Sequence, residues 1–150
     1  MDIIDKFCFY FEENRVVDFL SLFHTNSTYI DCLYGTFTGI KEIEFFFKKC
    51  HKEASNYKFK PINKILNNNL ASFEWEFSFV SNMPLSDGKN IFIKGCSFIT
   101  MNNNKIESYR DYADSVLFLI QGNVPAKKIV DFYNKKLQRE NYVKSIKDFK

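Results

Sequence analysis

The chain has 150 residues, of which 45% are hydrophobic and 26% are charged, proportions typical of a single soluble globular domain with a substantial core. The formal net charge of +3 is unevenly distributed, because residues 126–150 carry eight basic and three acidic side chains, which leaves 13 basic and 15 acidic side chains elsewhere. In residues 126–150 the basic side chains surround an apolar stripe of a predicted helix and do not alternate with aromatic rings that could stack on bases. We therefore expect these side chains to form a solvated helix face, and we expect no nucleic-acid partner.

Aromatic residues are unusually frequent, with 18 Phe, 8 Tyr and 1 Trp making up 18% of the chain. Such bulky rings form either a dense core or the walls of a cavity, and the composition favours the core.

The residue pattern does not indicate a metal-binding, cofactor-binding or membrane protein. The chain has four cysteines and two histidines without zinc-ligand spacing, and it has no glycine-rich phosphate loop, so we expect free thiols, no metal and no cofactor. The first residues are acidic, unlike a signal peptide, and no apolar run approaches the ~20 residues that cross a bilayer. We therefore expect a cytoplasmic protein with no membrane partner.

In chain order, helical patterns come first. Apolar residues three and four positions apart predict amphipathic helices, and the third helix has Ile40, Ile43, Phe47 and Cys50 on its inner stripe. Thr38 offers a hydroxyl that can cap this helix. The expected elements are helices over residues 2–13, from Val16 to near His24 and after Thr38, with a strand over 28–33 and a loop over 34–38.

From Tyr57 onward the pattern changes to that of strands separated by Asn-rich or Pro- and Gly-containing turns. Helices followed by a meander of long strands predict an α+β domain in which one curved sheet wraps around its helices. The predicted strands cover residues 57–66, 70–81, 89–100 and 105–114. After Gln121 a short linker precedes a predicted basic helix over residues 126–141, so we divide the chain into a domain over 1–121 and an extension over 122–150.

Two segments carry a resemblance to a known family. GCSFITMNNNKIESYRDYADSVLFLIQ (residues 95–121) resembles the closing hairpin of the SnoaL-like, nuclear transport factor 2-like superfamily, and NKIESYRDYAD is similar to the limonene-epoxide hydrolase branch. LFHTNSTYIDCLYGTFTGIKEIEFFFKKC (residues 22–50) resembles the superfamily's first strand, Gly-ended loop and third helix. The resemblance implies a cone-shaped fold, with three N-terminal helices on a curved, mostly antiparallel sheet. The C-terminal helix is additional.

The resemblance also implies candidate catalytic groups. Asp31 falls near the general-base aspartate of the ketosteroid isomerase branch, and aromatic walls would raise its pKa. The alternative for Asp31 is an exposed Asp beside a turn. That branch's tyrosine and protonated aspartate fall on Phe7 and Cys96, so its oxyanion chemistry is not reproduced here, although Tyr10 lies one turn from Phe7.

Asp114 matches the terminal Asp of the family's Tyr-x-Asp ending. Strand periodicity puts Ile106, Ser108, Arg110, Tyr112 and Asp114 on one face, which we expect to look into the cone. For Arg110 a surface ion pair with Asp111 is the favoured alternative. The strand over 70–81 has no arginine to complete a hydrolase triad; Glu74 and Glu76 are expected on its solvated face, and Trp75 on the inner face.

We therefore expect a domain that binds a small apolar or cyclic molecule, with possible acid–base catalysis of the isomerase, cyclase, dehydratase or hydrolase type. Asp31 and Asp114 are the predicted catalytic residues, and Tyr10, Tyr112, Trp75 and Arg110 the predicted substrate-binding residues. The alternative is a non-catalytic binding or scaffold domain. An interior filled by rings such as Phe45, Trp75 and Phe98 would favour the scaffold. The family also implies a homodimer.

Overall fold

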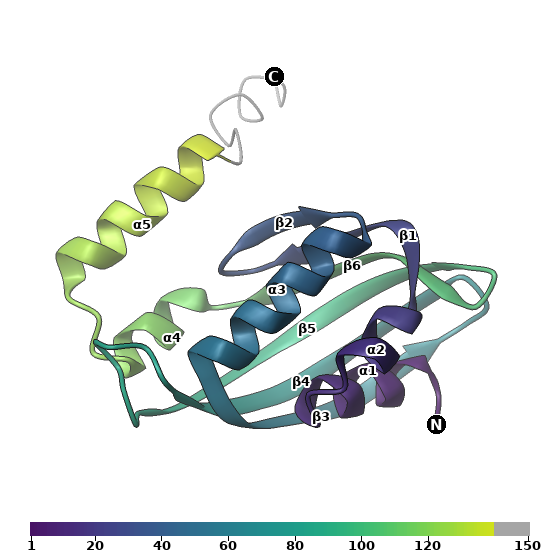
Figure 1. Ribbon diagram of the computed structural model, residues 1–150, viewed down its shortest axis with the longest axis horizontal. Coiled ribbons are helices and arrows are strands. Elements are labelled where there is room, and N and C mark those ends of the chain that lie inside the picture. The colour runs from purple at the N-terminus through teal and green to yellow at the C-terminus, as the bar shows by residue number, and fades with distance from the viewer. Residues whose placement is uncertain (140–150) are drawn as a thin grey trace.

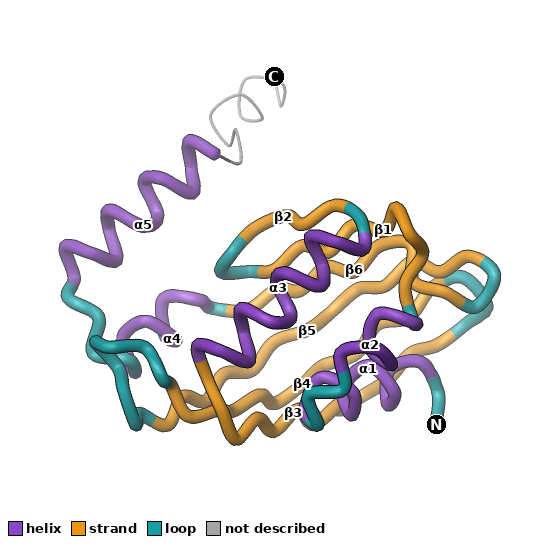
Figure 2. The backbone as a smooth tube through the Cα atoms, viewed as in Figure 1, coloured by secondary structure: helices purple, strands orange, loops and turns teal. Residues whose placement is uncertain are grey.

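The computed structural model describes residues 1–139 and consists of helices packed on one six-stranded sheet (Figures 1 and 2). The sheet is curved and does not close on itself, and the predicted α+β cone with an additional C-terminal helix is confirmed. The helices are α1 (Ile3–Glu12), α2 (Val16–Ser21), α3 (Ile40–Glu53), α4 (Ser115–Gln121) and α5 (Ala126–Arg139). The strands are β1 (Phe23–Asp31), β2 (Gly35–Thr38), β3 (Ala54–Leu66), β4 (Leu70–Ser81), β5 (Asn90–Asn102) and β6 (Lys105–Ala113).

The strands lie in the order β2-β1-β6-β5-β4-β3. Every neighbouring pair is antiparallel except β1 and β6, which run parallel and join the N-terminal strand to the last one. This single parallel pair brings the ends of two strands that are about 80 residues apart in sequence to the same edge of the molecule, as Ile30 pairs with Arg110.

The N-terminal helices cover one face of the sheet with aromatic side chains (Figure 1). Phe7 and Phe11 of α1 and Phe47 of α3 are almost fully buried, and the Phe7 ring stacks on Tyr109 with 4.6 Å between centroids. Burial of each such ring contributes about 1.5–3 kcal/mol relative to exposure, so this layer supplies much of the core. Asp2 caps α1 by accepting a hydrogen bond from the Asp5 amide.

Three local predictions were wrong. The strand predicted over residues 28–33 begins at Phe23, so the polar Thr25–Ser27 belong to β1. Ser27 is held there by its hydroxyl, which donates to the Ile106 carbonyl, and by its carbonyl, which accepts from the Gly39 amide at 2.8 Å. Residues 35–38 form β2 where a loop was predicted. Helix α3 is preceded by Gly39 with φ of 82° and has no side-chain cap, so Thr38 does not cap it. The predicted C-terminal helix is α5 as far as Arg139, and residues 140–150 of the predicted extension lie outside the described residues.

The inward face of β6 was also predicted wrongly. Ile106 is fully buried as expected, but the register against β5 shifts between the Thr100–Ser108 and Met101–Ile106 pairs, which leaves Glu107 as an extra, bulged residue. Beyond a one-residue bulge the side chains exchange faces. Tyr109 and Asp111 therefore point toward the helices, whereas Arg110 and Tyr112 point to the opposite, outer face.

None of the helices in residues 1–139 has the length and apolarity needed to span a bilayer.

Gly95 of β5 provides a test of this packing. It pairs with Trp75 of β4, and a Cβ added at Gly95 would lie 2.4 Å from the indole Cζ2 and 2.5 Å from the Tyr112 carbonyl oxygen. We expect Gly95→Ala to lower the free energy of unfolding by about 1–3 kcal/mol, measured by urea denaturation, because ring and backbone must both move. Cys96→Ala, at the neighbouring exposed position, is the matched control. Equal stability of the two variants would contradict this packing.

Candidate active site

A cavity of about 480 Å³ lies between the concave face of the sheet, α3, α4 and α5. Its walls are mainly aromatic and aliphatic, with Trp75 and Phe77 from the sheet, Phe46 from α3, Phe118 from α4 and Phe132 from α5. This volume is within the range of roughly 300–1,000 Å³ of pockets that hold small molecules. The aromatic residues thus form both a dense core and the walls of a cavity, and Phe45 and Phe98 do not fill it, since they are 63% and 46% exposed.

Asp31 lies in this cavity at the end of β1, where the chain turns toward β2. Its Oδ1 accepts hydrogen bonds from the backbone amides of Leu33 at 2.8 Å and Tyr34 at 2.6 Å. Asp31 therefore organises the turn, as the alternative expected, but it lines an apolar cavity and is not exposed. A catalytic role for Asp31 stays a prediction. Burial raises the pKa of Asp31, and the two amide donors and the positive charge of Lys136 oppose that rise.

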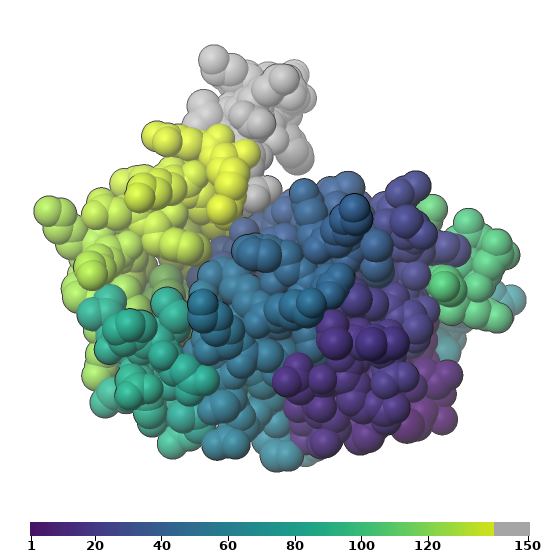
Figure 3. Space-filling view, in the orientation of Figure 1, coloured from purple at the N-terminus to yellow at the C-terminus, as the bar shows by residue number. Residues whose placement is uncertain are grey.

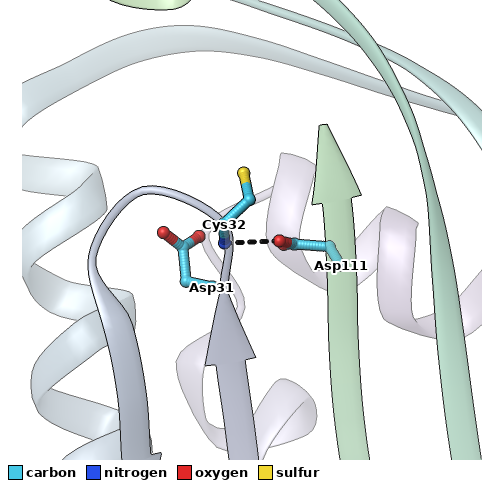
Figure 4. A group of neighbouring side chains, drawn as sticks. All are labelled: Asp31, Cys32 and Asp111. Atoms are coloured by element: carbon cyan, nitrogen blue, oxygen red, sulfur yellow. Dashed lines mark hydrogen bonds between the residues drawn. The ribbon is translucent and has the colours of Figure 1, made fainter. Parts of the chain in front are cut away.

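Asp111 of β6 lies beside Asp31, as Figure 4 shows, because the parallel register places the two strand ends side by side. Its Oδ1 accepts a hydrogen bond of 2.6 Å from the Cys32 amide. One ligand atom from each of Asp31, Cys32 and Asp111 lies within 4.8 Å of the other two. Burial, followed by the negative charge of Asp31, raises the pKa of Asp111 well above its usual value. Two acids so close in an apolar cavity each disfavour ionisation of the other.

A cation from the C-terminal helix acts on this acid pair. Lys136 of α5 donates a hydrogen bond from Nζ to the Cys32 carbonyl, and its charge lowers the pKa of both Asp31 and Asp111. Helix α5 is held at this end of the cavity by the Tyr133 hydroxyl, which hydrogen-bonds the Ser115 hydroxyl of α4. The region beyond Gln121 therefore contributes to the site.

The tyrosine hydroxyls of the cavity differ in whether they already form a hydrogen bond within the chain. Tyr34 donates to Glu53 at 2.6 Å, Tyr57 donates to the Cys50 carbonyl at 2.7 Å, and Tyr109 is hydrogen-bonded to Ser97 at 2.7 Å. The Tyr29 hydroxyl has no hydrogen-bond partner within residues 1–139, although Tyr29 lines the cavity and is only 3% exposed. Tyr29 is therefore the cavity tyrosine with a hydroxyl available to a ligand.

The predicted site residues separate into two groups. Asp31 and Trp75 line the cavity, and the Trp75 indole donates to the Ser97 hydroxyl at 2.8 Å. Tyr10 does not line it; its ring lies under the Arg15 guanidinium at 5.0 Å.

The prediction that Arg110, Tyr112 and Asp114 face into the cone is wrong. Arg110 donates to the Tyr112 hydroxyl on the outer face, where Tyr112 is 55% exposed. Asp114 is exposed and caps α4, accepting from the Val116 amide at 3.1 Å. Strict two-residue periodicity puts Asp111 on the outer face, so the sequence suggests it only as a surface partner of Arg110. The bulge at Glu107, which turns Asp111 inward, is not visible in the sequence pattern.

The raised pKa values predict a pH dependence of stability. Between the unfolded pKa of about 3.9 and the raised folded value, the folded protein binds more protons than the unfolded chain. The acid pair therefore stabilises the fold most at low pH, and this contribution is lost as the pH rises through the folded pKa. We expect the unfolding free energy of Asp111→Asn, followed by Trp75 fluorescence in urea, to decline less steeply above pH of about 4 than that of the wild type.

Asp114→Asn is the matched control for this measurement, because it changes an exposed aspartate of the same chain segment and should keep the wild-type slope. An Asp111→Asn protein with the wild-type slope would show that Asp111 is not held in a proton-retaining environment.

Comparison with solved structures places this geometry among known folds. A protein with a ketosteroid isomerase-like fold from Catenulispora acidiphila, in complex with trimethylamine, is 17% identical with a TM-score of 0.74, over 83% of this chain and 95% of that one. A candidate SnoaL-like polyketide cyclase from Shewanella putrefaciens is 16% identical with a TM-score of 0.70, over 81% and 94% of the two chains. An epoxide hydrolase from M. tuberculosis, described as similar to limonene-epoxide hydrolase, is 9% identical with a TM-score of 0.66, over 85% and 91%.

At these identities the likeness establishes the fold alone. No curated protein matches the chain significantly. A family model described as a SnoaL-like domain matches residues 4–109, which run from α1 into β6 and include Asp31 and the turn after it, whereas Asp111 lies just beyond the match. This match covers most of the chain, and the protein therefore belongs to the SnoaL-like domain family.

Proposed function

We propose that this protein binds a small apolar or cyclic molecule in the cavity and catalyses an acid–base reaction on it with Asp31 and Asp111. The observation that carries the proposal is the pairing of two carboxyl groups within 4.8 Å in a largely apolar cavity. The apolar walls fit a hydrocarbon skeleton, and the acid pair with Tyr29 fits one oxygen-bearing end of it.

The two carboxyl groups are suited to different roles. Asp31 accepts two backbone amide hydrogen bonds, which favour its ionised form, and can act as the base. Asp111, whose pKa is raised by burial and by the charge of Asp31, retains the proton and can act as the acid. Asp31 then takes a proton from a carbon beside a carbonyl, or from water, while Asp111 gives its proton to the substrate oxygen. Such a step serves an isomerase, cyclase, dehydratase or hydrolase.

A binding module without catalysis is the second candidate, and one observation favours it. Asp31 and Asp111 each use an oxygen to hold backbone amides of the turn after β1, at Leu33, Tyr34 and Cys32, which is a structural task that needs no substrate. In this case the cavity alone would carry the function.

To separate these functions, we would screen cyclic ketones, lactones and epoxides for turnover by product analysis, and measure cavity occupancy by displacement of a fluorescent apolar probe. We expect Asp31→Asn and Asp111→Asn to lose about 10²–10⁴-fold in turnover while still binding the probe, because a general acid or base contributes about that much. Asp114→Asn, outside the cavity, should keep full turnover. Probe binding without turnover of any class would support the binding module, and no probe binding would contradict both functions.

We also infer that the protein forms a homodimer through the outer face of the sheet. Phe92 and Phe98 of β5 and Tyr112 of β6 are 46%, 46% and 55% exposed on this face. Lys94 of β5 and Glu76 of β4 already pair within the chain at 3.1 Å. Arg110 of β6 and Glu74 of β4 remain as opposite charges that two copies related by a twofold axis can match.

Analytical ultracentrifugation tests the dimer. We expect the wild type to sediment as a dimer and Phe98→Glu as a monomer, since the new carboxylate would be buried without a partner. Phe45→Glu, at a 63% exposed position of α3, is the control and should remain dimeric. A monomeric wild type at high protein concentration would contradict the inference.

A further inference from the structure

A group of exposed apolar side chains lies on three segments that also line the cavity. Of the 17 large hydrophobic side chains that are exposed in residues 1–139, seven come from only three segments: the loop between β4 and β5, α4 and α5. Figures 1 and 3 show these segments together at one end of the molecule. The seven residues, here called the apolar rim, are Met83, Leu85, Val116, Leu117, Ile120, Val130 and Leu137.

Each of the three segments faces the cavity on one side and solvent on the other. In α4, Phe118 and Leu119 line the cavity, whereas Leu117 and Ile120 are 53% and 56% exposed, so this helix is apolar all round. Met83 and Leu85 both line the cavity and remain 43% and 52% exposed. The rim is therefore continuous with the cavity walls, and a helix that is apolar on its outer side normally has a covering partner.

Helix α5 adds positive charge to this rim. Val130 and Leu137, seven positions apart, lie on one stripe and are 58% and 45% exposed. The helix has no buried residue, and it carries Lys127, Lys128, Lys135, Lys136 and Arg139 against a single acid, Asp131. Asp87 in the β4–β5 loop and Asp114 at the start of α4 are the other acids of these segments, so cations remain in excess.

We propose that the apolar rim and the lysines of α5 dock the mouth of the cavity onto an anionic lipid bilayer. A basic helix with exposed apolar side chains binds such a surface by burying the apolar groups at the level of the lipid headgroups, while the lysines contact anionic lipids. A bilayer fits better than a protein partner because the rim opens into an apolar cavity, and a bilayer both covers the rim and dissolves the kind of molecule that the cavity would take up. We expected no membrane partner because no segment could span a bilayer, but docking on a bilayer surface needs no spanning segment.

Co-sedimentation of the full chain with vesicles tests the proposal independently of any catalysis. We expect binding to vesicles of phosphatidylcholine and phosphatidylserine, weaker binding to phosphatidylcholine alone, and loss of binding as salt is raised, because screening weakens attraction between exposed charges. The double variant Leu117→Ser, Ile120→Ser should bind about tenfold more weakly or worse, since each side chain loses burial in lipid. Lys127→Glu with Lys128→Glu should weaken binding to the anionic vesicles by at least about tenfold.

Matched controls are available far from the rim. Val17→Ser removes a 77% exposed apolar side chain of α2, and Lys41→Glu with Lys52→Glu reverses two exposed charges of α3; both should bind as the wild type does. The lysine variant keeps the proposal testable if the α4 variant does not fold, as judged by circular dichroism. Failure of the wild type to bind anionic vesicles at low salt, or equal binding by rim and control variants, would overturn the proposal. Self-association that the α4 variant abolishes, without vesicle binding, would show that a second copy covers the rim.

Discussion

The candidate site depends on one irregularity in the backbone, the bulge at Glu107 in β6. Without it, the two-residue period of the strand would continue from the buried Ile106 and would bring Ser108 and Arg110 to the inside. With it, Tyr109 completes the aromatic layer under α1, and Asp111 reaches the cavity. The pairing of β6 with β1 is also irregular here, but its extra residues lie on β1, which advances from Phe23 to Thr28 while β6 advances only from Ile106 to Ser108.

The candidate site also requires the parallel pairing of β1 with β6, because this pairing places Asp31 and Asp111 next to each other. Two neighbouring carboxyl groups in an apolar cavity are unfavourable in isolation. The backbone offsets part of this cost, since the amides of Cys32, Leu33 and Tyr34 all donate to the pair as the chain turns toward β2. The pair and the turn therefore stabilise each other, and the raised pKa values are the remaining sign of the cost.

Helices α4 and α5 connect this chemistry to the outside of the molecule. Asp114, the residue that ends the family-like Tyr-x-Asp motif, begins α4 by capping it, and α4 then continues along β5, where Gln121 hydrogen-bonds the backbone of Phe92. Helix α5 returns Phe132 to the cavity wall and Lys136 to the turn after β1. The division between a domain over residues 1–121 and an extension stays a prediction, but the residues of α5 take part in the same cavity.

The sequence by itself determined the fold class, the positions of the long helices and strands, and the inner face of Trp75, because amphipathic periods and turn residues act over a few neighbouring positions. Asp31 became a candidate through the resemblance of residues 22–50 to the family. Tertiary structure alone decided which face of β6 looks inward. A bulge leaves no composition signal in ESYRD, and its effect on Asp111 depends on the registers of β5 and β1, two strands that are distant in sequence. For the same reason β1 extends through the polar Thr25–Ser27, where the Ser27 hydroxyl donates to the carbonyl of Ile106, a residue distant in sequence.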